Sequence, residues 1–332
     1  METKFPFTDP SNHKPLQLEE VNGEQHLVSD GGSRYNIHDA IPDLKYPTEL
    51  DPIDQKAQVF YDNRAKAYES NMHLTFKTHR VNEQKCREEF IGALDIKNGD
   101  KVLDLACGTG RDSVIIAESL GDSGVLCMVD IAVEMLKICK AKMDKFTLQK
   151  HFCTANACYL PFPDNYFDST YSFGALGEFS DIKGSLAEMV RVTKTGGKIV
   201  VGDESMPPWL RNSYFYKVLK TTNPQFEEIV PLKEIPIEAR DFRLRYVING
   251  VFYLIDFRVG EGEPDADFDF AIPGVRGGTY RTRYDGQLEG VTPEAKSLLF
   301  EVIEKKGISM HEWLDELVKN GAEKELKGGK QS

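Results

Sequence analysis

Four residues in the first half of the chain have the types and spacing of a cofactor site. Asp104 lies in the apolar stretch "VLDLACGTGRD", and Gly108 and Gly110 follow it in a short turn. Asp130 ends the next apolar stretch, "GVLCMVD". A strand that leads through a glycine turn into a helix holds nucleotide-like ligands, because glycines let the ligand approach the backbone and the helix start offers free N–H groups.

The same residues discriminate between cofactors. A dinucleotide site requires G-x-G-x-x-G, and the third glycine position here is Ser113. A carboxylate at Asp104 would repel a pyrophosphate but would attract an ammonium group. Asp130 can accept hydrogen bonds from both hydroxyls of a ribose. The set predicts S-adenosylmethionine (SAM), which has an amino group, a sulfonium, a ribose and an adenine but no phosphate.

Alternating strands and helices must position these residues. Such an order implies a parallel sheet with right-handed crossovers, and we predict an α/β fold with a Rossmann-like, mostly parallel sheet and a terminal antiparallel hairpin. A small β unit with tight turns at Asn22-Gly23 and Gly31-Gly32, then helices, precede it. The strands are expected at 100–106, 124–130, 166–176 and 196–204, the helices at 111–120, 132–146 and 183–195, and the hairpin at 242–260.

The pattern divides the chain into five parts. We expect a small β unit at 1–50, a helical lid at 51–97, the SAM-binding core at 98–205, a substrate-side insertion with terminal strands at 206–290, and two closing helices with a frayed tail at 291–332, the fraying beginning near residue 321.

The stretches "VLDLACGTGRD", "VDIAVEML", "ANACYLPFPDNYFD" and "EMVRVTKTGGKIVV" together resemble the class I SAM-dependent methyltransferases, in the branch of the ubiquinone and menaquinone enzymes. The resemblance covers about residues 55–205. It implies methionine contacts from Asp104, Gly108 and Gly110, and ribose and adenine contacts further on. Ala106 replaces the family's first glycine, and Asn156 replaces an aspartate; Asn156 can still meet the adenine amino group through its carbonyl oxygen. The expected cofactor-binding residues are Tyr61, Tyr68, Asp104, Ala106, Gly108, Gly110, Asp130, Ile131, Met135, Asn156, Ala157, Phe173 and Gly174.

The N-terminal stretch "HLVSDGGSRYNIHDAIPDL" resembles the second half of a zinc-ribbon unit that precedes some methyltransferase domains. Cysteines of that unit would lie near Ser29 and Gly32 and, closer to the start, around His13, and they are absent. The six cysteines of the chain form no CxxC pair, so we expect no metal site.

Catalytic residues are harder to identify, because methyl transfer needs a base only when the acceptor arrives protonated. The acceptor should lie beyond the carboxyl ends of the strands. Glu178 and Glu204 follow such ends and are candidates for a general base, with solvated loop acids as the alternative. His73 lies in the lid region and is a third candidate, the alternative being a surface histidine.

Arginines and tyrosines gather among glycines in "IPGVRGGTYRTRYDGQLEG". Arginine binds carboxylates or phosphates in a two-point fashion, and tyrosine offers a ring and a hydroxyl. The segment is a candidate for binding an anionic or aromatic substrate; alternatively its arginines pair with the acids of "EGEPDADFDF". The candidates are Arg276, Tyr280, Arg281, Arg283 and Tyr284.

Composition narrows the function classes. The net charge of −12 disfavours nucleic acid as a partner, and no apolar run approaches the ~20 residues of a membrane span. The N-terminus lacks a signal-peptide core, so we expect a cytoplasmic methyltransferase acting on a small molecule, as a monomer or homodimer. The alternatives are a protein or RNA acceptor and a non-catalytic partner protein. Arsenite methylation is disfavoured, since no cysteine lies at Phe173-Gly174-Ala175.

Overall fold

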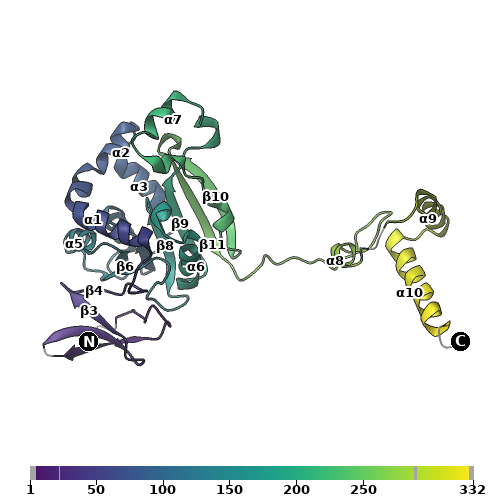
Figure 1. The fold of residues 1–332 in the computed structure, drawn as a ribbon, viewed down its shortest axis with the longest axis horizontal. Helices are drawn as coiled ribbons and strands as arrows, with labels where there is room; N and C mark the ends of the chain where they lie inside the picture. Colours follow the sequence, from purple (N-terminus) through teal and green to yellow (C-terminus); the bar gives the residue numbers. More distant parts are fainter. Residues whose placement is uncertain (1–4, 22, 288–289, 329–332) are drawn as a thin grey trace. The chain divides into compact units, whose positions relative to one another are not determined.

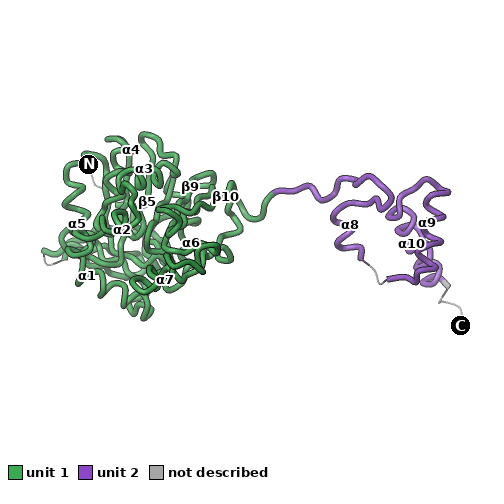
Figure 2. Tube along the Cα trace, turned by 90° about the horizontal axis from the view of Figure 1, so that it is seen from above, with its two compact units in different colours: residues 1–264 green, residues 265–332 purple. Residues whose placement is uncertain are grey.

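The computed structural model of the chain describes residues 5–21, 23–287 and 290–328. The chain forms two compact units, residues 1–264 and residues 265–332 (Figure 2). The segment 206–290, expected from the sequence to be one part, therefore belongs to both units. The expected boundary at 290/291 is not where the chain divides.

A seven-stranded sheet of order β10-β11-β9-β8-β5-β6-β7 forms the centre of the first unit (Figure 1). The strands from β5 to β9 pair in parallel, and β11 is antiparallel to both of its neighbours. This confirms the predicted sheet with its terminal hairpin. The strands are β5 (Lys101–Leu105), β6 (Val125–Asp130), β7 (Gln149–Thr154), β8 (Phe167–Phe173), β9 (Thr193–Glu204), β10 (Ala239–Val247) and β11 (Phe252–Val259).

Strand β7 was missing from the sequence prediction. Its sequence, "QKHFCT", begins with three polar residues and has no alternating pattern. The strand is nevertheless mostly buried, because the N-terminal sheet packs against this edge: the Leu44 N–H donates to the Thr154 carbonyl at 2.8 Å. Tertiary contact therefore explains a strand that local sequence does not reveal.

Helices cover the sheet, and their ends follow local capping chemistry. Asp51 caps α1 by accepting the Ile53 N–H at 2.8 Å, with Pro52 as the first helical residue, and Asn82 caps α3 by accepting the Lys85 N–H at 2.9 Å. The expected helical region before the core is confirmed. The helices of this unit are α1 (Pro52–Asn71), α2 (His73–Thr78), α3 (Glu83–Gly92), α4 (Arg111–Leu120), α5 (Val133–Met143), α6 (Ile182–Val192) and α7 (Tyr214–Leu219).

The expected N-terminal β unit is present as a four-stranded antiparallel sheet. Gly23 and Gly32 adopt φ values of 82° and 86°, the left-handed conformation that tight turns require; Asn22 lies outside the described residues. The likeness of this unit to a zinc ribbon stays a prediction. Its strands are β1 (Leu16–Val21), β2 (Glu24–Ser29), β3 (Arg34–His38) and β4 (Ile41–Pro42).

Short helical turns were not foreseen by the sequence analysis. Each spans too few residues for a helical period to show. Most lie in the insertion between β9 and β10, beside α7. They are η1 (Leu176–Glu178), η2 (Pro208–Leu210), η3 (Pro224–Glu227), η4 (Leu232–Glu234) and η5 (Ile248–Gly250).

The second unit contains α8 (Tyr280–Asp285), α9 (Pro293–Lys306) and α10 (Met310–Gly328). The two predicted closing helices are confirmed as α9 and α10. The prediction of fraying from residue 321 is wrong up to Gly328, because the helix continues and Lys327 pairs with Glu323 one turn earlier at 2.8 Å. Among the described residues, no helix has the length and apolarity that crossing a membrane requires.

Candidate active site

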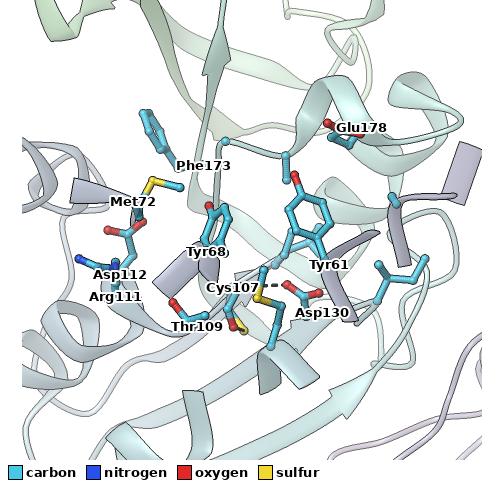
Figure 3. A pocket seen from close by; sticks show the side chains of 18 of the residues that line it. Tyr61, Tyr68, Met72, Cys107, Thr109, Arg111, Asp112, Asp130, Phe173 and Glu178 are labelled. Atoms are coloured by element: carbon cyan, nitrogen blue, oxygen red, sulfur yellow. Dashed lines mark hydrogen bonds between the residues drawn. The ribbon is translucent and has the colours of Figure 1, made fainter. Parts of the chain in front are cut away.

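A cavity of about 430 Å³ lies at the carboxyl ends of the parallel strands (Figure 3). Ligand pockets commonly measure roughly 300–1,000 Å³. Residues from the ends of β5, β6, β8 and β9 form its floor, and α1, α2, η1, η3 and β11 supply its walls. This is the edge at which open α/β sheets bind ligands.

The glycine turn forms one end of the cavity. A side chain at Gly110, where φ is 79°, would place its Cβ 2.5 Å from the Sγ of Cys139. At Gly108, where φ is 54°, a Cβ would meet nothing within 4 Å, so the bare backbone faces open space. Ala106 has the same left-handed φ of 54°, a conformation that glycine adopts without strain and alanine rarely adopts. The turn is thus a cradle that a ligand can fill.

Asp104 lines the cavity at the end of β5 and is fully buried. Its Oδ2 accepts the Ser113 hydroxyl at 2.5 Å, and no described residue donates to its other oxygen. Burial, reinforced by the nearby Asp112 carboxylate, raises the pKa of Asp104 well above its usual range. A cationic ligand group would give the second oxygen a donor and would stabilise the ionised carboxylate. The ammonium group of SAM fits this place.

Asp130 ends β6 and is held by the backbone. Its two oxygens accept the N–H groups of Gly108 and Ala132 at 2.8 and 2.9 Å. Burial raises the pKa of Asp130 to about 6. A carboxylate has about four lone-pair sites, so each oxygen keeps one for a ribose hydroxyl. The geometry therefore fits the predicted ribose contact.

Ile131, Met135, Asn156 and Ala157, all expected to bind the cofactor, line the adjoining wall. The resemblance implies that Asn156 and Ala157 lie along the adenine. The Asn156 amide is already engaged: its Nδ2 donates to Asp54 at 3.1 Å, and its carbonyl oxygen accepts the Cys158 N–H at 3.0 Å. The predicted adenine contact through that oxygen must therefore share it with the backbone.

Asp54 was not identified from the sequence. It is buried in the first turn of α1, where it also accepts the N–H and hydroxyl of Ser180 at 3.1 and 2.7 Å. Asp54 thus ties the start of the lid helix to the floor of the cavity. An acid after an N-cap looks in sequence like a helix-dipole residue, so no local signal marks this role.

Tyr61 and Tyr68 point from α1 into the cavity, as expected (Figure 3). Their rings make an edge-to-face contact with centroids 5.8 Å apart. Glu69 fastens the end of this helix to the glycine turn, because its carboxylate accepts the Thr109 hydroxyl at 2.5 Å and pairs with Lys142 at 2.7 Å and Arg111 at 3.3 Å. Helix α1 therefore covers the end of the cavity that the glycine turn forms.

A buried ion-pair network supports the cavity below the lid. Arg87 of α3 pairs with Asp112 at 2.8 Å and with Glu83 at 2.9 Å, and the Tyr171 hydroxyl donates to Asp112 at 3.2 Å. The paired acids raise the pKa of Arg87 despite its burial. The sequence does not reveal this network, since Asp112 and Tyr171 come from segments far from α3 in the chain.

Aromatic side chains line the opposite end of the cavity. Phe173 stacks between Phe90 and Phe252, with centroids 4.7 and 5.5 Å away and ring planes 23° and 17° apart. Gly174 follows with φ 77°, and a Cβ there would meet nothing within 4 Å, so the strand end stays open. Phe76 of α2 and Met72 complete an apolar wall.

Both carboxyls proposed from the sequence as bases line this end. Glu178 accepts a hydrogen bond from the Gln225 amide, and Glu204 accepts one from the Asn223 amide at 3.4 Å. Burial and the adjacent Asp203 carboxyl raise the pKa of Glu204 well above its usual range; burial also raises the pKa of Glu178. Asn223 and Gln225 were missed, because they lie in an irregular insertion.

The expectation that His73 reaches the site is wrong. His73 is the first residue of α2, its side chain is exposed, and it does not line the cavity. The helix turns Phe76 inward instead, because the apolar side chain gains from burial.

The arginine–tyrosine segment lies in the second unit. Arg281 pairs with Asp269 at 2.8 Å, and Arg283 donates to the Gly277 carbonyl at 2.9 Å. The Tyr280 ring packs edge-on against Phe270, at 5.7 Å between centroids. Asp269 belongs to the stretch "EGEPDADFDF", so Arg281 forms the ion pair that the sequence offered as the alternative to substrate binding. A substrate role for Arg276, Tyr280, Arg281, Arg283 and Tyr284 stays a prediction.

Comparison with known proteins agrees with this site. The chain is 37% identical over 163 residues to a ubiquinone/menaquinone biosynthesis C-methyltransferase of Francisella philomiragia, a match covering 48% of this chain and 63% of the relative. It is 36% identical over 139 residues to a demethylmenaquinone methyltransferase of Bacillus cereus, covering 41% and 56%. The chain thus spans about three fifths of the length of these curated relatives.

A solved structure of a putative SAM-dependent methyltransferase from Methanococcus maripaludis superposes with a TM-score of 0.44 at 19% identity, covering 66% of this chain and 98% of that one. The family model described as the ubiE/COQ5 methyltransferase family matches residues 51–231, which is more than half of the chain. The expectations of a methyltransferase fold and of SAM as cofactor are confirmed at the level of the family. The chain belongs to the ubiE/COQ5 methyltransferase family.

Proposed function

We propose that this chain transfers the methyl group of SAM to a ring carbon of a small quinol. One observation carries the proposal: a single cavity joins a cradle suited to SAM with an aromatic, carboxyl-lined end. The names of the relatives, a ubiquinone/menaquinone C-methyltransferase and a demethylmenaquinone methyltransferase, support a quinol as acceptor and carbon as the methylated atom.

The cofactor end holds SAM through charge and backbone contact. Asp104 holds the ammonium group, Asp130 accepts from the ribose hydroxyls, and the open backbone at Gly108 lies against the ligand. When bound, SAM supplies a methyl group that leaves its sulfonium as the acceptor carbon bonds to it, with the C–S electron pair staying on sulfur.

The acceptor end orients a flat ring and takes its proton. The ring packs among Phe76, Phe173 and Phe252, and its hydroxyl donates to Glu204. Removing that proton puts negative charge on the ring and raises the nucleophilicity of the ring carbon. After the methyl group has bonded to this carbon, the carbon releases its own proton to solvent and the ring oxygen takes back the proton held by Glu204, which restores the aromatic ring. The raised pKa of Glu204 lies closer to the pKa of a phenolic hydroxyl than an ordinary glutamate pKa does. This smaller difference favours transfer of the proton from the ring hydroxyl to Glu204.

Water exclusion is the task of α1. Tyr61 and Tyr68 lie over the cavity, and Glu69 and Asp54 fasten the two ends of the helix to the core. Positioning two reactants in a closed site accounts for much of the rate of a displacement that needs no covalent enzyme intermediate.

The test uses the full chain, SAM with a labelled methyl group, and a chemically reduced demethylmenaquinol with a short isoprenoid tail. We expect label on the ring carbon, detected by mass spectrometry, and SAM binding by calorimetry in parallel. Binding of SAM without transfer to the quinol would overturn the acceptor and keep the cofactor site. Absence of SAM binding would overturn the function as a whole.

A further inference from the structure

Two stretches beside the mouth of the cavity contain no acidic residue. They are residues 71–82 and 205–226, in a chain whose net charge is −12. Each also contributes to the cavity wall, the first through Met72, Thr75 and Phe76 and the second through Thr222, Asn223 and Gln225. We call the exposed side chains of these two stretches the mouth rim.

Tertiary contacts join the two stretches into one surface. The rings of His79, in the first stretch, and Phe215, in the second, meet edge to face with centroids 6.0 Å apart. Figure 1 accordingly shows α2 and α7 side by side. Residues far apart in the sequence therefore form a continuous rim.

The mouth rim exposes large apolar side chains. Helix α7 buries Tyr216 and Leu219 and leaves its other face uncovered. Isolated exposed apolar residues are ordinary, but a cluster beside a ligand cavity indicates an interaction surface. The exposed fractions are 45% for Leu74, 70% for Trp209, 83% for Tyr214, 39% for Phe215 and 44% for Val218.

Basic side chains accompany this apolar cluster. Lys77, Arg80 and Lys217 are exposed, and none forms an ion pair with any residue that the structure describes. Lys220 pairs with Glu227 at 3.0 Å, and Arg211 is occupied by backbone carbonyls. The free charge of the rim is therefore positive, although the chain as a whole is negative.

Aromatic rings next to lysine and arginine are the composition of a protein surface that lies in the headgroup layer of a bilayer. A second copy of the chain suits the rim less well, because a two-fold contact would place the same cations opposite one another. Anionic lipid headgroups instead complement them.

We propose that the mouth rim docks on the surface of an anionic bilayer, with the cavity mouth at the level of the headgroups. The docking is peripheral: Trp209, Tyr214 and Leu74 enter the interface, and Lys77, Arg80 and Lys217 pair with lipid phosphates. The inference concerns this surface alone and does not depend on the acceptor proposed above.

Flotation of the full chain with vesicles tests the proposal, using phosphatidylcholine with and without phosphatidylglycerol. We expect binding to the anionic vesicles that weakens with salt. Replacing Lys77 and Lys217 together by Gln should lower the partition coefficient roughly 25-fold, about fivefold for each cation removed. Lys296→Gln, at an exposed lysine of α9, is the matched control and should change little.

The contribution of the exposed aromatic side chains is tested with a second pair of variants, one in the mouth rim and one outside it. Tyr214 and Tyr284 are 83% and 79% exposed, and they lie in different units. We expect Tyr214→Ser combined with Trp209→Ser to abolish flotation and Tyr284→Ser to leave it unchanged, with SAM affinity intact in both variants. Equal binding to both vesicle types, loss with Tyr284→Ser, or a rim-dependent dimer that ignores vesicles would overturn the proposal.

Discussion

The two ends of the cavity are built in different ways. At the glycine-turn end, Asp104, Gly108 and Asp130 come from two neighbouring strands and the turn between one of them and its helix, and Asp130 is fixed by backbone N–H groups. At the acceptor end, the carboxyls are held by side chains from an insertion: Gln225 donates to Glu178, and Asn223 donates to Glu204.

This difference indicates at which end of the cavity side chains can be substituted without loss of the fold. Backbone contacts depend on the turn itself, so altering them disturbs the sheet edge. Side-chain contacts from an insertion can be replaced without moving a strand. The acceptor end is therefore the place where one scaffold can be adapted to different small molecules.

The largest expected effect comes from filling the cradle. Gly108→Arg places a side chain where the ligand would lie, and we expect a loss of SAM affinity of more than ~10³-fold, or over about 4 kcal/mol. Calorimetry measures it. Gly196→Arg is the control, since Gly196 also has a positive φ, 81°, with nothing within 4 Å of its Cβ, and does not line the cavity. A similar loss in both variants would show backbone strain rather than a filled site.

Removing the proposed base should affect catalysis and spare the cofactor. For Glu204→Gln we expect kcat to fall about 10²–10⁴-fold, with the Kd for SAM unchanged within about twofold. In the wild type, kcat should fall on the acid side through a pKa above the usual glutamate value, because burial raises the pKa of Glu204 and the base must be ionised. Glu178→Gln is the comparison, and a larger loss there would reassign the base.

Asp130 should make SAM binding depend on pH near 6. Ribose hydroxyls donate to the ionised form, so the affinity should decline as the pH falls through about 6. Asp130→Asn should weaken SAM about 10- to 100-fold, because hydrogen bonds to a charged group contribute about 1.5–3 kcal/mol. It should also remove the change in affinity near pH 6, while the ionisation of Asp104, whose pKa is raised as well, still affects the affinity. Asp168→Asn removes a carboxylate that accepts the Lys101 N–H elsewhere on the sheet and should leave that change in affinity intact.

The same group affects stability without ligand. The folded-state pKa of Asp130, about 6, exceeds the value of about 3.9 expected for an unfolded chain, so the folded state binds the proton more tightly. The contribution of Asp130 to the free energy of unfolding should therefore fall as the pH rises from about 4 to about 6. Chemical denaturation of wild type and Asp130→Asn across this range measures it; parallel curves would contradict the assignment.

The smallest expected effect is on ring packing. Phe252→Leu removes one face of the aromatic stack, and we expect the acceptor KM to rise about two- to tenfold, since aromatic pairs contribute about 0.5–1.5 kcal/mol beyond burial. Phe162→Leu removes a buried ring outside the cavity and controls for lost stability, which thermal melts record. Equal changes in KM would show a general packing defect.

Much of the fold follows from local sequence. Alternating apolar strands and capped helices predict the parallel core, and the ends of the helix Arg111–Leu120 are set by Gly110 and Gly121. Strand β7 escaped prediction because burial of "QKHFCT" depends on the N-terminal sheet. The short helical turns escaped it because three or four residues show no period.

The residues of the candidate site likewise fall into those that the local sequence reveals and those that it does not. Asp104, Gly108, Gly110 and Asp130 are identifiable because they lie in the last two residues of a strand or in the short turn after it, and parallel strands end at one edge. Asp54, Arg87, Asn223 and Gln225 are not, because each gains its role from a partner distant in sequence. His73 shows the converse error: proximity to the lid in sequence does not fix the direction of a side chain.

The sequence by itself determined the type of sheet, the glycine turn and the two acids that suit SAM, since strand periodicity, left-handed turns and charge are local properties. Tertiary structure alone decided which side chains hold the two carboxyls at the acceptor end and which loops close the cavity. It also brought residues 71–82 and 205–226 together into one basic, aromatic rim. Those outcomes depend on packing between distant segments, and no local pattern encodes the energy of such contacts.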